Sequence, residues 1–311
     1  MIILVTGGAG FIGSHLIQAL HQAGHVIVNV DEMNDYYNPV FKIQNLELFS
    51  AYKNYTFYKT DICDRVSLEK IFETHQPDVV IHLGARAGVR PSVQNPALYK
   101  RVNYEGTKQL VDLAKQFGVK QFIFGSTSAV YGNITPPFSE SITNLSPVSP
   151  YAVYKLQAEQ YLSKKILPTT ILRFFTVYGE RGRPDMAPYL FTEAVLNHKP
   201  IHKFGDGTTS RDYTYIQDII SGIMAAINHP LDFEIINLGN HQAVSLNDFI
   251  KTLENITGQT AVIEPQPSQT GEMQHTLADI SKARRLLDYS PTTSLQVGLT
   301  QFVNWYKTHR L

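Results

Sequence analysis

The sequence predicts an α/β protein, with a doubly wound parallel sheet and a smaller C-terminal α/β lobe. Three observations predict it: apolar runs alternate with amphipathic segments, a glycine-rich turn follows the first apolar run, and this rhythm changes after about residue 175. Alternating strands and helices form parallel sheets that are covered by helices on both faces. A chain of 311 residues with 43% hydrophobic content can bury such a core.

The elements of the sheet follow from apolar runs that are long enough to be buried on both faces. The expected strands are Ile2–Thr6, His25–Asp31, Asn54–Lys59, Val79–Leu83, Gln121–Gly125 and Thr169–Phe174. The expected helices are Ser14–Ala23, Pro39–Phe49, Arg65–Thr74, Tyr99–Phe117 and Tyr151–Leu167. Gly24, Gly118 and Pro168 stand where three of these helices should end.

The last 136 residues predict a second lobe, with one return to the sheet. Gly179–Pro188 and Phe204–Ser210 are loop-like, and Glu234–Leu238 predicts a further strand of the first sheet. Helices are expected at Tyr189–Leu196, Gln217–Ile227, Leu246–Thr257 and Ser281–Leu287. We therefore expect one domain over residues 1–175 with a return around 210–240, and a lobe over 176–209 and 241–311.

The overall composition excludes several classes of partner. Lys+Arg and Asp+Glu balance at 27 each without a basic stripe, so nucleic acid is not expected. The single cysteine, Cys63, excludes an intrachain disulfide and is expected to be a buried apolar thiol. No apolar run is long enough to span a bilayer and the histidines lack ligand spacing, so we expect a cytoplasmic protein without membrane or metal.

The turn TGGAGFIG is the strongest local signal for a ligand. It places Gly7, Gly10 and Gly13 between the first strand and the first helix, where a Rossmann-type fold binds a pyrophosphate against the helix N-terminus. Asp31 ends the second strand 18 residues after Gly13, where a carboxylate binds a ribose 2′-hydroxyl. Asp31 and the following Glu32 disfavour a 2′-phosphate. NAD is therefore expected rather than NADP, and flavin is less favoured.

A second signal joins the turn STSAVYG to a tyrosine and a lysine on one helix. Tyr151 and Lys155 are four residues apart and share a helix face, whereas Tyr154 is rotated away by about 100° and is expected to pack. An ammonium beside a phenol lowers the pKa of the phenol, which makes Tyr151 a candidate base. A hydroxyl from Thr127 or Ser126 would hold the substrate's alcohol. The same spacing also fits an ordinary amphipathic helix, but the two turns together favour catalysis.

Motifs spread along the chain resemble those of the extended short-chain dehydrogenases/reductases. They are TGGAGFIG (6–13), TDICD (60–64), HLGARAGVR (82–90), STSAVYG (126–132), Tyr151 with Lys155, RFFTVYGERGRPDM (173–186), FGDGTTSRDYTYIQD (204–218) and ADISKA (278–283). Within that family the sequence is most similar to the nucleotide-sugar epimerases, and among these to the UDP-glucuronate 4-epimerases. The resemblance implies tightly bound NAD, oxidation at C4 to a 4-keto sugar, rotation of the sugar and return of the hydride.

The resemblance also implies roles for individual residues. Thr127 is the catalytic hydroxyl, Tyr151 the base and Lys155 its partner. The implied cofactor-binding residues are Gly7, Gly10, Phe11, Ile12, Gly13, Asp31, Asp61, Ile62, Leu83, Gly84, Ala85, Asn103, Tyr151 and Lys155. The implied substrate-binding residues are Arg90, Ser126, Thr127, Ser128, Thr176, Arg183, Arg211 and Glu272. Family members dimerise through the helices predicted here over 99–117 and 151–167, so a homodimer is expected.

The residues after Thr127 separate the reactions of the family. Dehydratases carry an acid pair there and uronate decarboxylases carry Ser-Glu, whereas this chain has Ser128 and Ala129. Without that carboxylate, epimerisation is the favoured reaction. Thr176 stands where neutral-sugar 4-epimerases carry asparagine, which favours a uronate. The alternatives are a UDP-glucose or UDP-N-acetylhexosamine 4-epimerase, then a UDP-glucuronate decarboxylase, then a non-catalytic NAD-binding sensor.

Four arginines keep more than one interpretation. Arg211 matches a diphosphate-binding arginine of the family, but a salt bridge to a neighbouring aspartate is the alternative. Arg183 and Arg90 fit either an anion contact or an ordinary position in a loop. Arg86 stands where relatives commonly have glutamine, and its role stays open.

Overall fold

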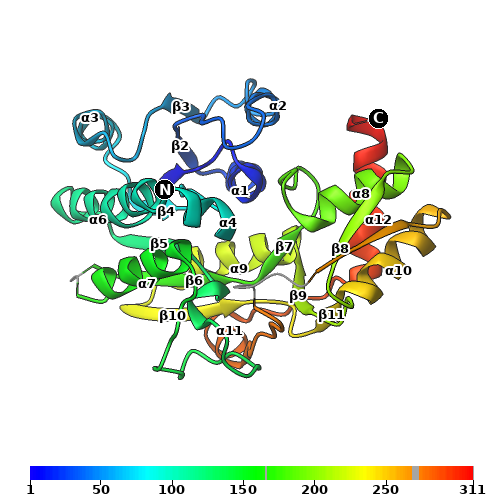
Figure 1. The fold of residues 1–311 in the computed structure, drawn as a ribbon. Coiled ribbons are helices and arrows are strands. Elements are labelled where there is room, and N and C mark those ends of the chain that lie inside the picture. The colour runs from blue at the N-terminus through cyan, green and yellow to red at the C-terminus, as the bar shows by residue number, and fades with distance from the viewer. Residues whose placement is uncertain (165–166, 268–272, 311) are drawn as a thin grey trace.

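The structure is a computed structural model that describes residues 1–164, 167–267 and 273–310 (Figure 1). A seven-stranded parallel sheet with the order β10-β6-β5-β4-β1-β2-β3 forms its larger part. The strands are Ile2–Thr6 (β1), Val26–Asp31 (β2), Tyr55–Lys59 (β3), Val79–His82 (β4), Gln121–Thr127 (β5), Thr169–Phe174 (β6) and Phe233–Leu238 (β10). The doubly wound α/β prediction is confirmed, as is the late return of the chain as a sheet strand beside β6.

Helices cover both faces of this sheet, because successive strand side chains point to opposite faces. In β1, Ile3 and Val5 belong to one core, which also contains residues of α1 (Phe11–Gln22) and α9 (Ile216–Asn228). Leu4 belongs to the other core. The helices on that side are α3 (Arg65–His75), α6 (Thr107–Gln116) and α7 (Pro150–Leu162). Among the described residues, no helix is long and apolar enough to cross a membrane.

The strand order reverses at β1, which pairs with β2 on one side and with β4 on the other. Loops that leave β1 and β4 therefore diverge, and in such sheets ligands bind at the carboxyl ends of the strands at this point. The glycine turn follows β1 and the HLGARAGVR segment includes the end of β4. The fold thus brings two predicted motifs to one sheet edge.

Two predicted helices have other limits in the structure. The segment expected as one helix over 99–117 consists of α5 (Pro96–Tyr99), a π-helical segment (η1, Lys100–Gly106) and α6. Such π-helical turns often lie at functional sites. The helix expected to reach Leu167 ends at Leu162, and Leu167 is buried in the core just before β6.

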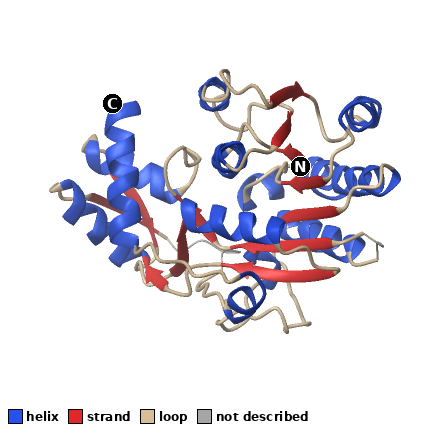
Figure 2. Cartoon of the chain, turned by 180° about the vertical axis from the view of Figure 1, so that it is seen from behind, coloured by secondary structure: helices blue, strands red, loops and turns tan. Residues whose placement is uncertain are grey.

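The smaller lobe contains two short sheets and is the lobe seen beside α8 and α12 in Figure 1 and, from behind, in Figure 2. Its strands are Thr176–Tyr178 (β7), Ser210–Tyr215 (β9) and Ala243–Ser245 (β11) in one sheet, and Pro200–Phe204 (β8) and Val262–Gln266 (β12) in the other. Helices Ala187–Leu196 (α8), Leu246–Thr257 (α10) and Leu295–His309 (α12) pack here. The remaining helices are Val40–Glu47 (α2), Val89–Gln94 (α4), Ser128–Tyr131 (η2, a 3₁₀ turn) and Ser281–Leu287 (α11). The strands of the two short sheets and α12 were not among the sequence predictions.

Candidate active site

The glycine turn forms a narrow cradle between β1 and α1. Gly7 has a φ of 75°, and a Cβ atom there would lie 2.8 Å from the backbone nitrogen of Gly84. A Cβ atom on Gly13 would collide with the carbonyl oxygen of Gly7. Gly10 caps α1 without a side-chain acceptor, so the first helical N–H groups keep no side-chain partner from the cap. A cradle that excludes side chains and exposes helix N–H groups fits a pyrophosphate.

A cavity of about 420 Å³ opens at this edge of the sheet. It is lined by the glycine turn, by the residues that follow the central strands, and by parts of α7 and the lobe. The predicted site residues that line it are Gly7, Gly10, Phe11, Ile12, Gly13, Asp31, Ile62, Leu83, Gly84, Ala85, Ser126, Thr127, Ser128, Tyr151, Lys155, Thr176 and Arg183. Residues from six separate motifs therefore meet in one cavity.

Asp31 lies at the end of β2 and is buried, with 5% of its surface exposed. Its carboxylate accepts hydrogen bonds from the backbone N–H groups of Ala9, at 3.2 Å, and Met33, at 2.9 Å. Lys42 of α2 donates to the same carboxylate at 3.0 Å and forms a buried ion pair. The predicted ribose-binding acid is thus present in the cavity, but a cation that the sequence did not indicate neutralises it.

Tyr151, Thr127 and Lys155 lie together where β5 ends and α7 begins. Tyr151 and Thr127 both line the cavity, and the Thr127 hydroxyl accepts from the Ala129 N–H at 3.1 Å. Lys155 is 3% exposed and donates to the carbonyl oxygen of Gly125 at 2.7 Å. This arrangement holds a phenol, a hydroxyl and an ammonium at one end of the cavity.

The pKa of Tyr151 differs from the sequence prediction. Burial raises the pKa of the Tyr151 phenol, and the nearby Thr127 hydroxyl and the Arg183 charge oppose this shift. Burial also lowers the pKa of Lys155 to about 7, although Glu159 opposes this shift. The expectation that Lys155 lowers the pKa of Tyr151 is therefore wrong for this structure. Desolvation disfavours both charged forms, and it outweighs the effect of the nearby charges.

A buried ion pair supports the turn that carries Thr127. Glu159 and Arg173 are each 2% exposed and form two hydrogen bonds, at 2.6 and 3.1 Å. The Ser126 hydroxyl donates to the same carboxylate at 2.5 Å. The Ser126 side chain, expected at the substrate, is thus bound to Glu159. Glu159 was missed at the sequence level, although it lies four residues after Lys155 on α7, on the same helix face.

Three candidate contacts for the sugar line the same cavity as Tyr151. Ser128 and Thr176 contribute small hydroxyl side chains, and Arg183 contributes a cation. The Arg183 guanidinium binds both carboxylate oxygens of Asp185, at 2.9 and 2.6 Å. Tyr36, from the loop after β2, donates to Asp185 at 3.1 Å. The arginine of the RGRPDM motif is therefore held by an acid of the same motif.

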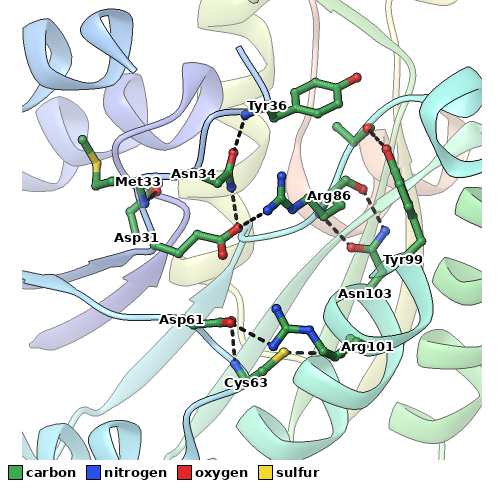
Figure 3. A network of polar contacts seen from close by, with 12 residues as sticks. Asp31, Met33, Asn34, Tyr36, Asp61, Cys63, Arg86, Tyr99, Arg101 and Asn103 are labelled. Atoms are coloured by element: carbon green, nitrogen blue, oxygen red, sulfur yellow. Dashed lines mark hydrogen bonds and ion pairs between the residues drawn. The ribbon is translucent and has the colours of Figure 1, made fainter. Parts of the chain in front are cut away.

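Four other predicted residues lie outside the lining of this cavity. Asp61 forms an ion pair with Arg101 at 3.0 Å, and Asn103 is buried in η1. Figure 3 shows where these residues lie. Arg90 packs on the ring of Phe204 at 5.3 Å. Arg211 donates to two backbone carbonyls, at 3.0 and 3.2 Å. Glu272 lies outside the residues that the structure describes.

Cys63, expected as a buried apolar thiol, is only half-buried and lies near Asp61 (Figure 3). Its thiol donates to the carbonyl oxygen of Arg101 at 3.4 Å. Burial, followed by the charge of Asp61, raises the pKa of the thiol to about 12. A thiol of this kind stays protonated at neutral pH and is a poor nucleophile.

The chain is similar to known proteins over nearly its whole length. Residues 3–239 match the model of the NAD-dependent epimerase/dehydratase family. A UDP-glucuronate 4-epimerase from Thermodesulfobacterium geofontis is 43% identical over 309 residues, which cover 98% of this chain and 95% of the relative. The crystal structure of UDP-glucuronic acid 4-epimerase from Bacillus cereus, in complex with UDP-glucuronic acid and NAD, superposes with a TM-score of 0.93 at 40% identity and covers 99% of both chains. A UDP-glucose 4-epimerase from Thermotoga maritima, solved with UDP-glucose, has a TM-score of 0.92 at 33% identity over 99% of both chains.

Proposed function

Because the chain belongs to the NAD-dependent epimerase/dehydratase family, we propose that it is a UDP-glucuronate 4-epimerase that interconverts UDP-glucuronate and UDP-galacturonate. One observation carries the choice of sugar: Ser128, Thr176 and Arg183 line the same cavity as Tyr151. Among the described lining residues, the carboxylates are Asp31 and Glu32 at the end of β2. At the reaction end, the described lining residues thus offer hydroxyls and a cation to a sugar carboxylate, and no acid for elimination or decarboxylation.

The cavity also supports NAD as the cofactor. The glycine cradle and the N-terminus of α1 would hold the pyrophosphate, Asp31 would bind the adenosine ribose, and Ile62 would border the adenine. When bound, NAD takes the hydride from C4 of the sugar and returns it to the opposite face. A cofactor regenerated in each turnover has no need to leave.

The protein's own groups move the proton and control the sugar. Tyr151, as phenolate, accepts the proton of the C4 hydroxyl and later returns it. Thr127, which lines the cavity with Tyr151, would orient this hydroxyl. The positive charge of the bound nicotinamide, together with a protonated Lys155, would offset the burial that raises the pKa of Tyr151. A uronate with a ketone at C4 is a β-keto acid, which readily loses carbon dioxide. Ser128, Thr176 and Arg183 would hold the carboxylate in an unproductive orientation.

We further propose a cytoplasmic homodimer that associates through η1, α6 and α7, with the chain divided into domains as the sequence predicted. Supporting the interface, η1 and α7 pack together, and Lys108 lies over the rings of Tyr104 and Tyr161 at 5.2 and 5.3 Å. A single cysteine suits a reducing compartment. Light scattering should give a mass of twice 35.0 kDa.

The test is to incubate the purified protein with UDP-glucuronate, without added NAD, and to follow the products by NMR. UDP-galacturonate is the expected product. UDP-xylose with released carbon dioxide would instead identify a decarboxylase. Inertness toward UDP-glucuronate with turnover of UDP-glucose would favour the neutral-sugar alternative, which the UDP-glucose complex of the Thermotoga maritima relative brings into the comparison.

A further inference from the structure

Arg86 lines the cavity beside the end of β2 and takes no part in the proposed chemistry. Its Nη2 atom lies 3.5 Å from Oε1 of Glu32, the residue that follows Asp31. Figure 3 shows the Arg86 guanidinium pointing toward the loop that carries Asn34, and the Asn34 amide donates to the same Glu32 oxygen. The loop after β4 thus places the Arg86 cation next to Glu32, the residue that follows the proposed ribose-binding acid Asp31.

The backbone of Arg86 is fixed, so its side chain starts from a defined place. The Asn103 amide accepts from the Arg86 N–H and donates to the Arg86 carbonyl oxygen, both at 2.8 Å (Figure 3). The Tyr99 hydroxyl donates to the carbonyl oxygen of the next residue, Ala87. The Nε atom of Arg86 is buried and has no hydrogen-bond partner within the described part of the chain. The guanidinium therefore has a donor without a partner at the ribose end of the cavity, which is the end lined by Asp31, Glu32, Lys42 and Arg86.

The two carboxylates at the end of β2 are satisfied differently. Asp31 is closed in by two backbone N–H groups and Lys42, and only 4% of its side chain is exposed. The Glu32 side chain is 23% exposed, and its cationic partner is Arg86. Because Lys42 already neutralises Asp31, the charge of Asp31 alone is a weak barrier to a phosphorylated ribose. Whether Arg86 is paired with Glu32 or free to bind a ligand then decides how strongly a phosphate binds at this place.

In dinucleotide-binding folds, an acid after the second strand binds a free 2′-hydroxyl, and an arginine near it accommodates a 2′-phosphate. This chain has both groups and joins them in an ion pair. We propose that Glu32 determines the choice of coenzyme by occupying Arg86, so that the site takes NAD, and that Arg86 binds the 2′-phosphate of NADP once Glu32 is removed. The inference rests on the proposed use of NAD by this cavity.

The experiment is a double-mutant cycle with Glu32→Gln, Arg86→Gln and the double variant. Each purified protein is equilibrated with equal concentrations of NAD⁺ and NADP⁺ and freed of unbound nucleotide. It is then denatured, so that the bound nucleotides can be quantified by chromatography. Asp35→Asn is the matched control, because it removes one negative charge from an exposed position of the same loop.

Wild type and Asp35→Asn are expected to carry mainly NAD. In Glu32→Gln the bound NADP:NAD ratio should rise about tenfold or more, the effect of one charge-assisted hydrogen bond. Adding Arg86→Gln should return the ratio to the wild-type value. If Glu32→Gln is unstable, Glu32→Asp replaces it, since its shorter side chain withdraws the carboxylate from Arg86 and should raise the ratio less.

An unchanged ratio in the Glu32 variants would overturn the inference, as would an equal rise with and without Arg86, which would mean a simple charge effect. A wild-type protein that retains neither nucleotide would instead overturn the proposed function. The two failures are therefore distinguishable.

Discussion

The two ends of the cavity hold their charged groups in different ways. At the reaction end, Lys155, Glu159 and Arg173 are at most 3% exposed and have partners that are themselves buried. At the ribose end, Glu32 and Arg86 face each other with 23% and 15% of their side chains exposed. The reaction end is a closed network, whereas the ribose end adds a partly exposed ion pair to the buried pair of Asp31 and Lys42.

This difference separates two kinds of functional residue. A buried charge that loses its partner keeps its full desolvation cost, so the reaction end should respond to substitution with lost rate or lost stability. A partly exposed pair costs little to break, and its charges can turn to a ligand. The ribose end should therefore respond with altered selectivity.

Tyr151→Phe should have the largest effect, a fall in kcat of roughly 10²–10⁴-fold, because general acid–base catalysis contributes about that much. The measurement is the rate of UDP-galacturonate formation by NMR, with bound NAD quantified in parallel. NAD content should stay at the wild-type level, since the cradle is untouched.

Tyr154→Phe is the matched control for this prediction. Tyr154 lies on the same helix but faces an outer groove together with Lys164 and Gln157. Because this substitution removes only a hydroxyl and Tyr154 does not line the cavity of Tyr151, it should change kcat by no more than about twofold. Equal losses in the two variants would remove Tyr151 from its proposed role.

Glu159→Ala should destabilise the fold by about 3–5 kcal/mol, since it leaves the buried Arg173 guanidinium without its carboxylate. Urea unfolding gives the free energy. It should also lower kcat, because Ser126 loses the acceptor that holds the turn next to Thr127.

The double variant Glu159→Leu, Arg173→Met is the control, because it removes both charges and should be less destabilised than Glu159→Ala. A single variant that is as stable as the double variant would show that the pair carries little desolvation cost. The buried charges of the reaction end would then stabilise the fold no more than the partly exposed pair of the ribose end does.

The sequence predicts the site residues well where they lie close together in the chain, and poorly where remote segments bring them together. Tyr151 and Lys155 share a helix face with Glu159, so the helical period places all three on one stripe. The cations of the ribose end come from remote segments: Lys42 from α2 and Arg86 from the loop after β4. Their pairing depends on how β1, β2 and β4 assemble, which no local pattern indicates.

The failed predictions have the same origin. The predicted direction of the Tyr151 pKa shift was wrong, because a sequence motif indicates a charged neighbour but not how deeply the phenol is buried. The short strands of the lobe, such as Pro200–Phe204, mix apolar and polar residues without a period of two. The π-helical turn within 99–117 replaces a continuous α-helix without any break in the amphipathic pattern.

Arg183 is intermediate between the two ends, because its side chain is 21% exposed, as at the ribose end, yet the proposed function assigns it to the sugar. Arg183→Met should lower kcat/KM for UDP-glucuronate by roughly 10–100-fold, the value of a charged hydrogen bond of about 1.5–3 kcal/mol. Any turnover of UDP-glucose, which lacks the carboxylate, should fall much less. Parallel losses for the two substrates would assign Arg183 to the lobe structure rather than to the uronate.

The smallest effect concerns Lys155 and pH. Burial lowers its pKa to about 7, whereas an unfolded lysine titrates near 10.4. Between these values the unfolded chain binds one proton more, so Lys155 makes the free energy of unfolding rise with pH, by at most about 1.4 kcal/mol per unit. Urea unfolding of nucleotide-free protein at pH 7.5 and 8.5 should show this rise in wild type and in the exposed-lysine control Lys199→Met, but not in Lys155→Met. Equal slopes in all three would mean that Lys155 keeps its proton when folded, so that the buried ammonium is available to Tyr151 throughout this range.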